Sequence, residues 1–214
     1  MSRKLVHVAL TAASRQDLVG AWTRLGFTLD SGGAGVTLAD GDRLDFLARV
    51  DAAQTSVAAG LSGAPGEKLP AIADAAASCF QLAAVAPVAR ARAPAHPNGA
   101  LGLRSVVALA DEPADHGEFL SALTGQREMR TTSAGLELRL DNASLDVLSP
   151  RAFAFHFGVT PPASDFAIAG LVFAVADLAK TEAILRANKI ASMFQVGRLS
   201  AGVVEGVAVA FERV

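Results

Sequence analysis

The chain repeats one plan three times, and this repeat constrains its fold more than any other feature. Each copy begins with a short run rich in Val and Leu, passes through a turn into an amphipathic helix, and ends in two or three short strands. The copies begin with KLVHVALTAASRQDLVGAWTRLGFTL, LGLRSVVALADEPADHGEFLSALTGQ and FAIAGLVFAVADLAKTEAILRANKI. A repeated unit of this size buries its apolar face against a neighbouring copy. The repeat therefore predicts an α+β chain built from βαβββ modules.

The turn before each helix aligns the copies. Ser14, Asp111 and Asp177 fall at the same place, where a short polar side chain caps the first turn of a helix. Gly26 and Gly125 follow two of the helices, as left-handed C-terminal caps do. The strands expected after the helices are FTLDS, GVTLAD and RLDFLARV, then GQREMRTT, GLELRLD and ASLDVLSP, then ASMFQV, GRLSAG and GVAVAFERV.

The stretch between the first two copies departs from this plan. DAAQTSVAAGLSGAPGEKLP is rich in Ala, Gly, Ser and Pro and is typical of a mobile connection. AIADAAASCFQLAAVAPVARARAP predicts a short helix and one strand, which is half of a module. We therefore expect a first module over residues 1–50, a linker and degenerate half-module over 51–95, a second complete module over 96–160 and a third over 161–214.

Composition and charge exclude several classes of protein. The formal net charge is −2, and no basic stripe extends beyond Arg90 and Arg92, so nothing favours a nucleic-acid partner. No uninterrupted apolar run reaches the roughly 18 residues of a membrane span, and no N-terminal segment has the order of a signal peptide. A single cysteine, Cys79, suits a reducing compartment. We expect a cytoplasmic protein without a membrane partner.

Two carboxylates stand inside strands that ought to be apolar. Asp45 interrupts RLDFLARV, and Asp146 interrupts ASLDVLSP about a hundred residues later. Because side chains alternate between the two faces of a strand, both carboxylates point either to water or into a shared cavity. The strand pattern alone leaves both interpretations open.

The repeated plan resembles the vicinal oxygen chelate superfamily, which includes glyoxalase I, extradiol dioxygenases and bleomycin-resistance proteins. HPNGALGLRSVVALADEPADHGEFLSALTGQRE through SLDVLSPRAFAFHFGVTPP, with the third copy, is similar to bacterial glyoxalase-like proteins. The resemblance runs from about His96 to the C-terminus and, in outline, over residues 4–50. It implies that modules pair into curved, cup-shaped mixed sheets with room for a small ligand. Four complete modules are expected, and here the second is reduced.

The resemblance also implies a divalent metal, held by a His on the first strand and a Glu on the last strand of each paired module. The matching positions are His7 and Asp45, then Arg104 and Asp146, then Gly170 and approximately Ala210. Arginine cannot ligate a metal, and the third copy offers no ligand. We therefore expect the cup of the last two modules to be metal-free, with Arg104 free to pair with Asp146.

His7 and Asp45 leave several interpretations open. A two-fold homodimer could bring both residues from each chain to one His2Asp2 site for Zn, Ni, Fe or Mn. Alternatively, the two residues form a hydrogen-bonded pair or are simply polar positions of their strands. A homodimer is expected in any case, because the reduced module leaves apolar surface to cover.

The remaining histidines carry weaker predictions. His156 lies among three Phe residues in FAFHFG, which suggests a buried or pocket-lining imidazole next to Phe155. His96 is expected to be a turn residue bonded to its own backbone. His116 is expected to be solvated beside Asp111 and Asp115.

The favoured function is binding of a small molecule in a metal-free cup, with no cofactor. The expected ligand-binding residues are His7, Asp45, Arg104, Asp146, Phe155 and His156. The alternative is a metal-dependent lyase, isomerase or dioxygenase whose site is formed by His7 and Asp45 across a dimer. A third hypothesis is a degenerate survivor of an enzyme family, kept for oligomer contacts. The sequence identifies no catalytic residue.

Overall fold

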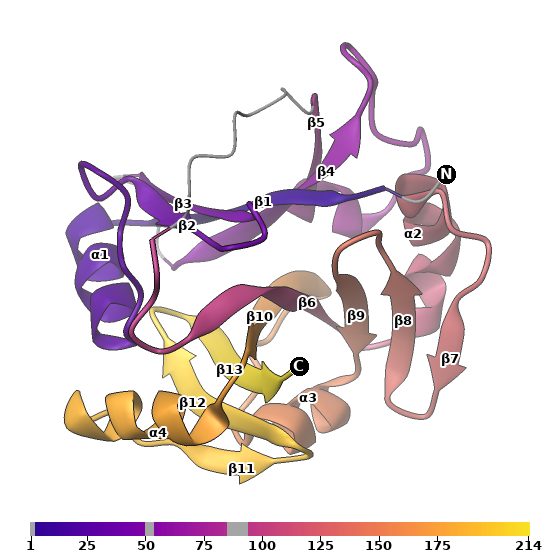
Figure 1. The fold of residues 1–214 in the computed structure, drawn as a ribbon. Helices are drawn as coiled ribbons and strands as arrows, with labels where there is room; N and C mark the ends of the chain where they lie inside the picture. The colour runs from indigo at the N-terminus through magenta and orange to yellow at the C-terminus, as the bar shows by residue number, and fades with distance from the viewer. Residues whose placement is uncertain (1–2, 50–53, 85–93) are drawn as a thin grey trace.

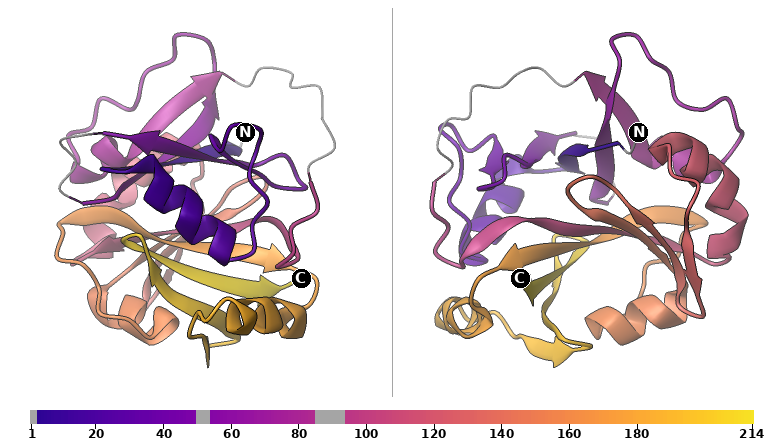
Figure 2. Two further views of the ribbon diagram at one scale, coloured as in Figure 1. Left: turned by 90° about the vertical axis from the view of Figure 1, so that its left-hand side faces the viewer. Right: turned by 45° about the vertical axis from the view of Figure 1, so that its right-hand side comes forward.

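A computed structural model describes residues 3–49, 54–84 and 94–214, so Arg90 and Arg92 lie outside the described residues. Within those ranges the strands form two curved mixed sheets, stacked one above the other (Figures 1 and 2). The smaller sheet has the order β2-β3-β1-β4-β5. Its strands are β1 (Leu5–Ala12), β2 (Gly35–Thr37), β3 (Arg43–Ala48), β4 (Ser56–Gly63) and β5 (Phe80–Ala84).

The larger sheet contains eight strands in the order β11-β12-β13-β10-β6-β9-β8-β7. Its strands are β6 (Ala100–Ala110), β7 (Arg130–Thr132), β8 (Gly135–Arg139), β9 (Ser144–Leu148), β10 (Phe166–Val175), β11 (Met193–Gln195), β12 (Arg198–Val204) and β13 (Val207–Arg213). The helices are α1 (Arg15–Arg24), α2 (Gly117–Thr124), α3 (Pro150–Phe157) and α4 (Leu178–Ala187), with 3-10 turns η1 (Ala75–Cys79) and η2 (Pro113–His116). No helix in the described ranges is long and apolar enough to cross a membrane.

The strand pairing follows the repeat. In each copy the last strand lies parallel to the first, in the pairs β1–β3, β6–β9 and β10–β13. The first strands of the second and third copies, β6 and β10, then pair antiparallel. These pairings confirm the expected α+β fold of curved sheets built from βαβββ units.

The region expected to be a connection contains a strand. β4 (Ser56–Gly63) pairs antiparallel with β1 and parallel with β5, as a first strand of a module does. Its sequence, SVAAGLSG, has weak strand propensity because Ala, Gly and Ser dominate it. Hydrogen bonding to β1 therefore determines its conformation, and the reduced unit is completed within this chain's own sheet.

The expected helix caps are confirmed at two of three positions. The Ser14 side chain accepts a hydrogen bond from the Asp17 N–H, and Asp177 accepts from Ala179 and Lys180. Asp111 does not cap a helix, because η2 precedes α2 and begins at Pro113 without a side-chain cap. Among the expected strands, FTLDS is not one in the structure.

The larger sheet separates the buried side chains into two groups. The main core lies between the sheets and includes Trp22, Phe46, Phe119 and Phe173. A second cluster lies on the other face of the larger sheet, where Phe153 and Phe157 of α3 pack on Val107, Ala169, Val172 and Ala210, among others. In Figures 1 and 2, α3 lies on the side of the larger sheet that faces away from the smaller sheet. No helix was expected over Pro150–Phe157 from the sequence.

Candidate functional site

The face of the larger sheet that carries α3 also carries a pocket of about 200 Å³. This cup pocket draws side chains from β6, β8, β9, α3, β12 and β13. Its charged and titratable lining residues are Arg104, Glu137, Asp146, His156, Arg198 and Glu212. The structure thus brings together three of the predicted site residues, Arg104, Asp146 and His156.

Strand alternation explains why Asp146 reaches the pocket. Leu145 and Val147 on either side of it are buried in the main core, so Asp146 points to the opposite face. There the Ser105 hydroxyl donates a hydrogen bond of 2.6 Å to Asp146 Oδ2. Asp146 therefore lines a cavity rather than facing open water.

The surroundings of Asp146 favour its protonated form. Burial raises the pKa of this carboxyl, and the charge of Glu137 adds to the rise. Hydrogen bonds from Ser105 and Ser144, and the charge of Arg198, act in the opposite direction without cancelling it. The rise widens the pH range over which this carboxyl is protonated and can donate as well as accept a hydrogen bond.

Arg104 pairs with a carboxylate that the sequence analysis missed. Its Nε lies 3.7 Å from Glu212 Oε1, whereas Arg198 Nε lies 3.0 Å from Glu212 Oε2. The expected Arg104–Asp146 pair is not formed. In GVAVAFERV, residues Ala208, Ala210 and Glu212 share one face of β13, so strand alternation could have revealed Glu212.

Helix α3 places His156 and Phe155 differently. His156 lines the cup pocket, and its Nδ1 is buried without a hydrogen-bond partner among the described residues. Burial lowers the pKa of the imidazole, as does Arg198, while Asp146 partly offsets this. Phe155 is 65% exposed and lines no part of the cup pocket, because it lies on the solvent side of the helix.

His7 and Asp45 lie apart from this pocket, on the smaller sheet. Both point away from the larger sheet, since their neighbours Val8, Leu44 and Phe46 are in the main core. His7 Nε2 lies 2.7 Å from Gln81 Nε2, whereas Asp45 pairs with Arg43 at 3.0 Å. Each residue thus has its own partner, and the structure shows no hydrogen bond between His7 and Asp45.

The other two histidines have structural partners. His96 is buried; its Nδ1 accepts from the Thr28 N–H at 3.1 Å, and its Nε2 lies 3.1 Å from the Thr37 carbonyl. His116 was expected to be solvated but is only 13% exposed and lies 2.7 Å from Asp74. This contact joins η2 to the turn before η1. His96 does begin a turn, in which its carbonyl accepts from the Gly99 N–H, but its side chain bonds Thr28 and Thr37 rather than its own backbone. The expectation that His116 is solvated was wrong.

On the larger sheet, the residues at the expected ligand positions do not fit the superfamily's metal. Arg104 occupies one expected ligand position, and at another, Gly170, an added Cβ would lie 2.7 Å from Phe157 Cζ. The aromatic ring of α3 therefore fills the space in which a ligand side chain from β10 would lie. In the described parts of the chain, no three His, Cys, Asp or Glu side chains gather as a metal site would require.

Comparisons with known proteins support the fold and go no further. No family model matches the chain, and no curated protein matches it in sequence. Solved structures do match, at 10–15% identity, which is evidence of shared fold alone.

Three of these structures illustrate the likeness. A xylose isomerase-like TIM barrel/4-hydroxyphenylpyruvate dioxygenase fusion protein aligns with all of this chain at 10% identity and a TM-score of 0.60, and the chain spans only 49% of it. The 2,2',3-trihydroxybiphenyl 1,2-dioxygenase of Sphingomonas wittichii strain RW1 aligns over all of this chain and 91% of its own length, at 15% identity and a TM-score of 0.57. A catechol 2,3-dioxygenase aligns over 99% of this chain and 87% of its own length, at 12% identity and a TM-score of 0.58. These neighbours belong to the vicinal oxygen chelate superfamily, and their fold is of the extradiol dioxygenase and glyoxalase type.

Proposed function

We propose that the chain is a glyoxalase-like protein that binds a small, oxygen-rich polar molecule in the cup pocket without a metal. The observation that carries this proposal is the position of α3. Its Phe157 ring lies against Gly170 in the cup, and the space left beside it is lined by Arg104, Asp146 and His156. A pocket of about 200 Å³ suits a ligand of only a few heavy atoms.

Each of the three residues has an unused binding capacity. Arg104 is 57% exposed along its side chain and only loosely paired with Glu212, so its guanidinium can bind a carboxylate. His156 Nδ1 has no partner within the described residues, and a ligand hydroxyl would supply one. Asp146 can donate to a ligand oxygen when protonated. Together these groups suit a short hydroxy acid or keto acid.

Glycolate is a suitable probe for this proposal. We expect it to shift the NMR signals of Arg104, Asp146 and His156, and we expect Arg104→Gln to weaken binding at least about fivefold. Arg186→Gln is the matched control, because Arg186 is an exposed arginine of α4 that pairs with Glu182 away from the pocket. Equal binding by the two variants, or no glycolate-induced shift in the cup pocket, would refute the proposal.

A second candidate is metal-dependent chemistry at the smaller sheet. The observation that favours it is that His7 and Asp45 lie on neighbouring strands and on the same open face, since β1 and β3 pair His7 with Arg43 and Ala9 with Asp45. One chain supplies too few ligands, so a homodimer would have to contribute a second set. Elemental analysis together with mass measurement by light scattering tests this. About one Zn, Ni, Fe or Mn per dimer, lost in His7→Ala, would support it, whereas a metal-free protein would refute it.

A further inference from the structure

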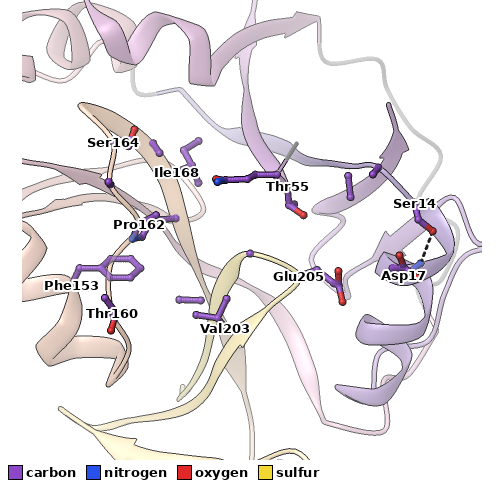
Figure 3. Close-up of a pocket in the computed structure, with 18 residues that line it drawn as sticks. Ser14, Asp17, Thr55, Phe153, Thr160, Pro162, Ser164, Ile168, Val203 and Glu205 are labelled. Atoms are coloured by element: carbon purple, nitrogen blue, oxygen red, sulfur yellow. Dashed lines mark hydrogen bonds between the residues drawn. The ribbon is translucent and has the colours of Figure 1, made fainter. Parts of the chain in front are cut away.

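A second and larger cavity lies where the first and third copies of the repeat meet. This seam cleft has a volume of about 600 Å³ and shares no lining residue with the cup pocket. One side is formed by the end of β1, the start of α1, residues 54 and 55, and Glu205 in the turn between β12 and β13. The other side is formed by α3, the chain leading into β10, and Val203 near the end of β12. Figure 3 shows the side chains that line it.

The two sides of the seam cleft differ in chemistry. Phe153, Pro162, Ile168 and Val203 form a largely apolar wall, which lies toward one side in Figure 3 together with the hydroxyl residues Thr160 and Ser164. Figure 3 draws the two carboxylates that line the cleft, Asp17 of α1 and Glu205 of the β12–β13 turn, on the other side. A ligand that fills the cleft therefore meets apolar surface at one end and negative charge at the other.

The described lining of the seam cleft holds no cation to compensate its two carboxylates. Among the lining residues that the structure describes there is no Lys, Arg or His. Within the described ranges, neither Asp17 nor Glu205 takes part in an ion pair, although Asp17 donates its backbone N–H to Ser14. Carboxylates in a concave, partly apolar site attract cations more strongly than carboxylates on an open surface.

The backbone fixes Glu205 at this position. Val204 pairs with Val207, so Glu205 and Gly206 form a two-residue hairpin turn with φ values of 48° and 80°. The turn packs on the smaller sheet's side of the molecule, because a Cβ added at Gly206 would lie 3.2 Å from Thr55 Cβ. The Glu205 carboxylate is therefore held across the cleft from the apolar wall rather than on a mobile loop.

We propose that the seam cleft binds an organic monocation with an apolar body, such as an arylalkyl amine. Its ammonium group would lie between Asp17 and Glu205, and its apolar body would contact Phe153, Pro162 and Ile168. The volume is within the range of small-molecule sites. A bare metal ion fits less well, because the described lining supplies only two carboxylates and no His or Cys side chain.

The 214-residue chain can be titrated with 2-phenylethylamine and followed by amide NMR. We expect shifts centred on Ser14, Thr55, Ile168 and Glu205, and binding at least about tenfold weaker for the neutral analogue 2-phenylethanol. The double variant Asp17→Asn/Glu205→Gln should weaken amine binding at least about fivefold. Its matched control is Asp115→Asn/Glu118→Gln, which removes two exposed carboxylates near the start of α2 and should leave binding unchanged.

A third variant tests the position of the ligand independently of the carboxylates. Val203 is 54% exposed, so Val203→Lys should fold normally while placing a competing cation in the cleft, and it should abolish amine binding. Arg104→Gln should leave amine binding intact, because the cup pocket is separate. Equal binding of amine and alcohol, equal effects of the two double variants, or full binding by Val203→Lys would each overturn the proposal.

Discussion

Asp42 shows what burial does to one carboxyl group of this chain. It is 1% exposed in the turn between β2 and β3, where Oδ1 accepts a 2.7 Å hydrogen bond from Asn142 Nδ2. Its Oδ2 is buried without a partner among the described residues. Burial, followed by the charge of Asp40, raises the pKa of Asp42 to about 7, although Lys4 opposes the rise.

This pKa makes the stability of the fold depend on pH. The unfolded chain loses the Asp42 proton near 3.8, whereas the folded chain keeps it to about 7, so the free energy of unfolding falls as pH rises between these values. Asp42→Asn keeps the shape of the side chain and removes its charge. We expect the substitution to raise the free energy of unfolding at pH 8 by on the order of 2 kcal/mol more than it does at pH 4. Urea unfolding at both pH values measures this. An unchanged pH slope, compared with an Asp111→Asn control, would contradict it.

The sequence around Asp42 could not reveal this burial. ADGDR has the composition of an exposed turn, and Asp40 and Gly41 do form one. Asp42 is buried because Asn142, a hundred residues away, lies against it. Asp45 and Asp146 could be found because strand alternation is a local signal, whereas contacts between distant turns leave no such pattern.

At the scale of elements, α3 determines what the cup can hold. Its ends follow familiar rules, with Ser149 accepting from the Ala152 N–H, Pro150 in the first turn, and Gly158 in a left-handed conformation. These signals were present in LSPRAFAFHFG. The helix was not predicted, because the repeated plan has no helix at this place and the apolar residues of this segment did not indicate helical rather than strand periodicity. His156 lines the cup pocket, and the prediction that it binds a ligand stays open to test. Phe155 could be placed only once the phase of the helix was known.

Close packing between α3 and β10 can be tested at Gly170. An added Cβ would lie 2.7 Å from Phe157 Cζ and 3.3 Å from Val107 Cβ, and the ring is fully buried. We expect Gly170→Ala to destabilise the fold by about 1–3 kcal/mol, because overpacking displaces α3. In Phe157→Leu the shorter side chain should relieve the clash, so the double variant should be more stable than the sum of the single effects predicts. Strict additivity in urea unfolding would show that the ring does not restrict Gly170.

At the scale of the whole molecule, polar side chains join the two sheets. Asn98 is buried and donates to the Leu25 carbonyl at the end of α1, while Thr181 of α4 donates to the Asn98 carbonyl. His96 links the chain before β6 to Thr28 and Thr37 of the first copy. The repeat predicted the modules from sequence, but these contacts between modules depend on single residues in connections that no periodicity marks.

His96 should make this joint sensitive to acid in the direction opposite to Asp42. Nδ1 accepts from the Thr28 N–H, so the imidazole has to be neutral, and burial lowers its pKa below 6.5. The unfolded chain therefore takes up the proton first, and stability is lost as pH falls below 6.5. In an Asp42→Asn background, which removes one group of opposite effect, we expect the free energy of unfolding to fall between pH 7.5 and 5.5. Adding His96→Gln, which does not titrate, should lower stability at pH 7.5 by about 1–2 kcal/mol and make it less dependent on pH. If both variants lose the same stability on acidification in urea unfolding, His96 does not carry the acid sensitivity of the joint.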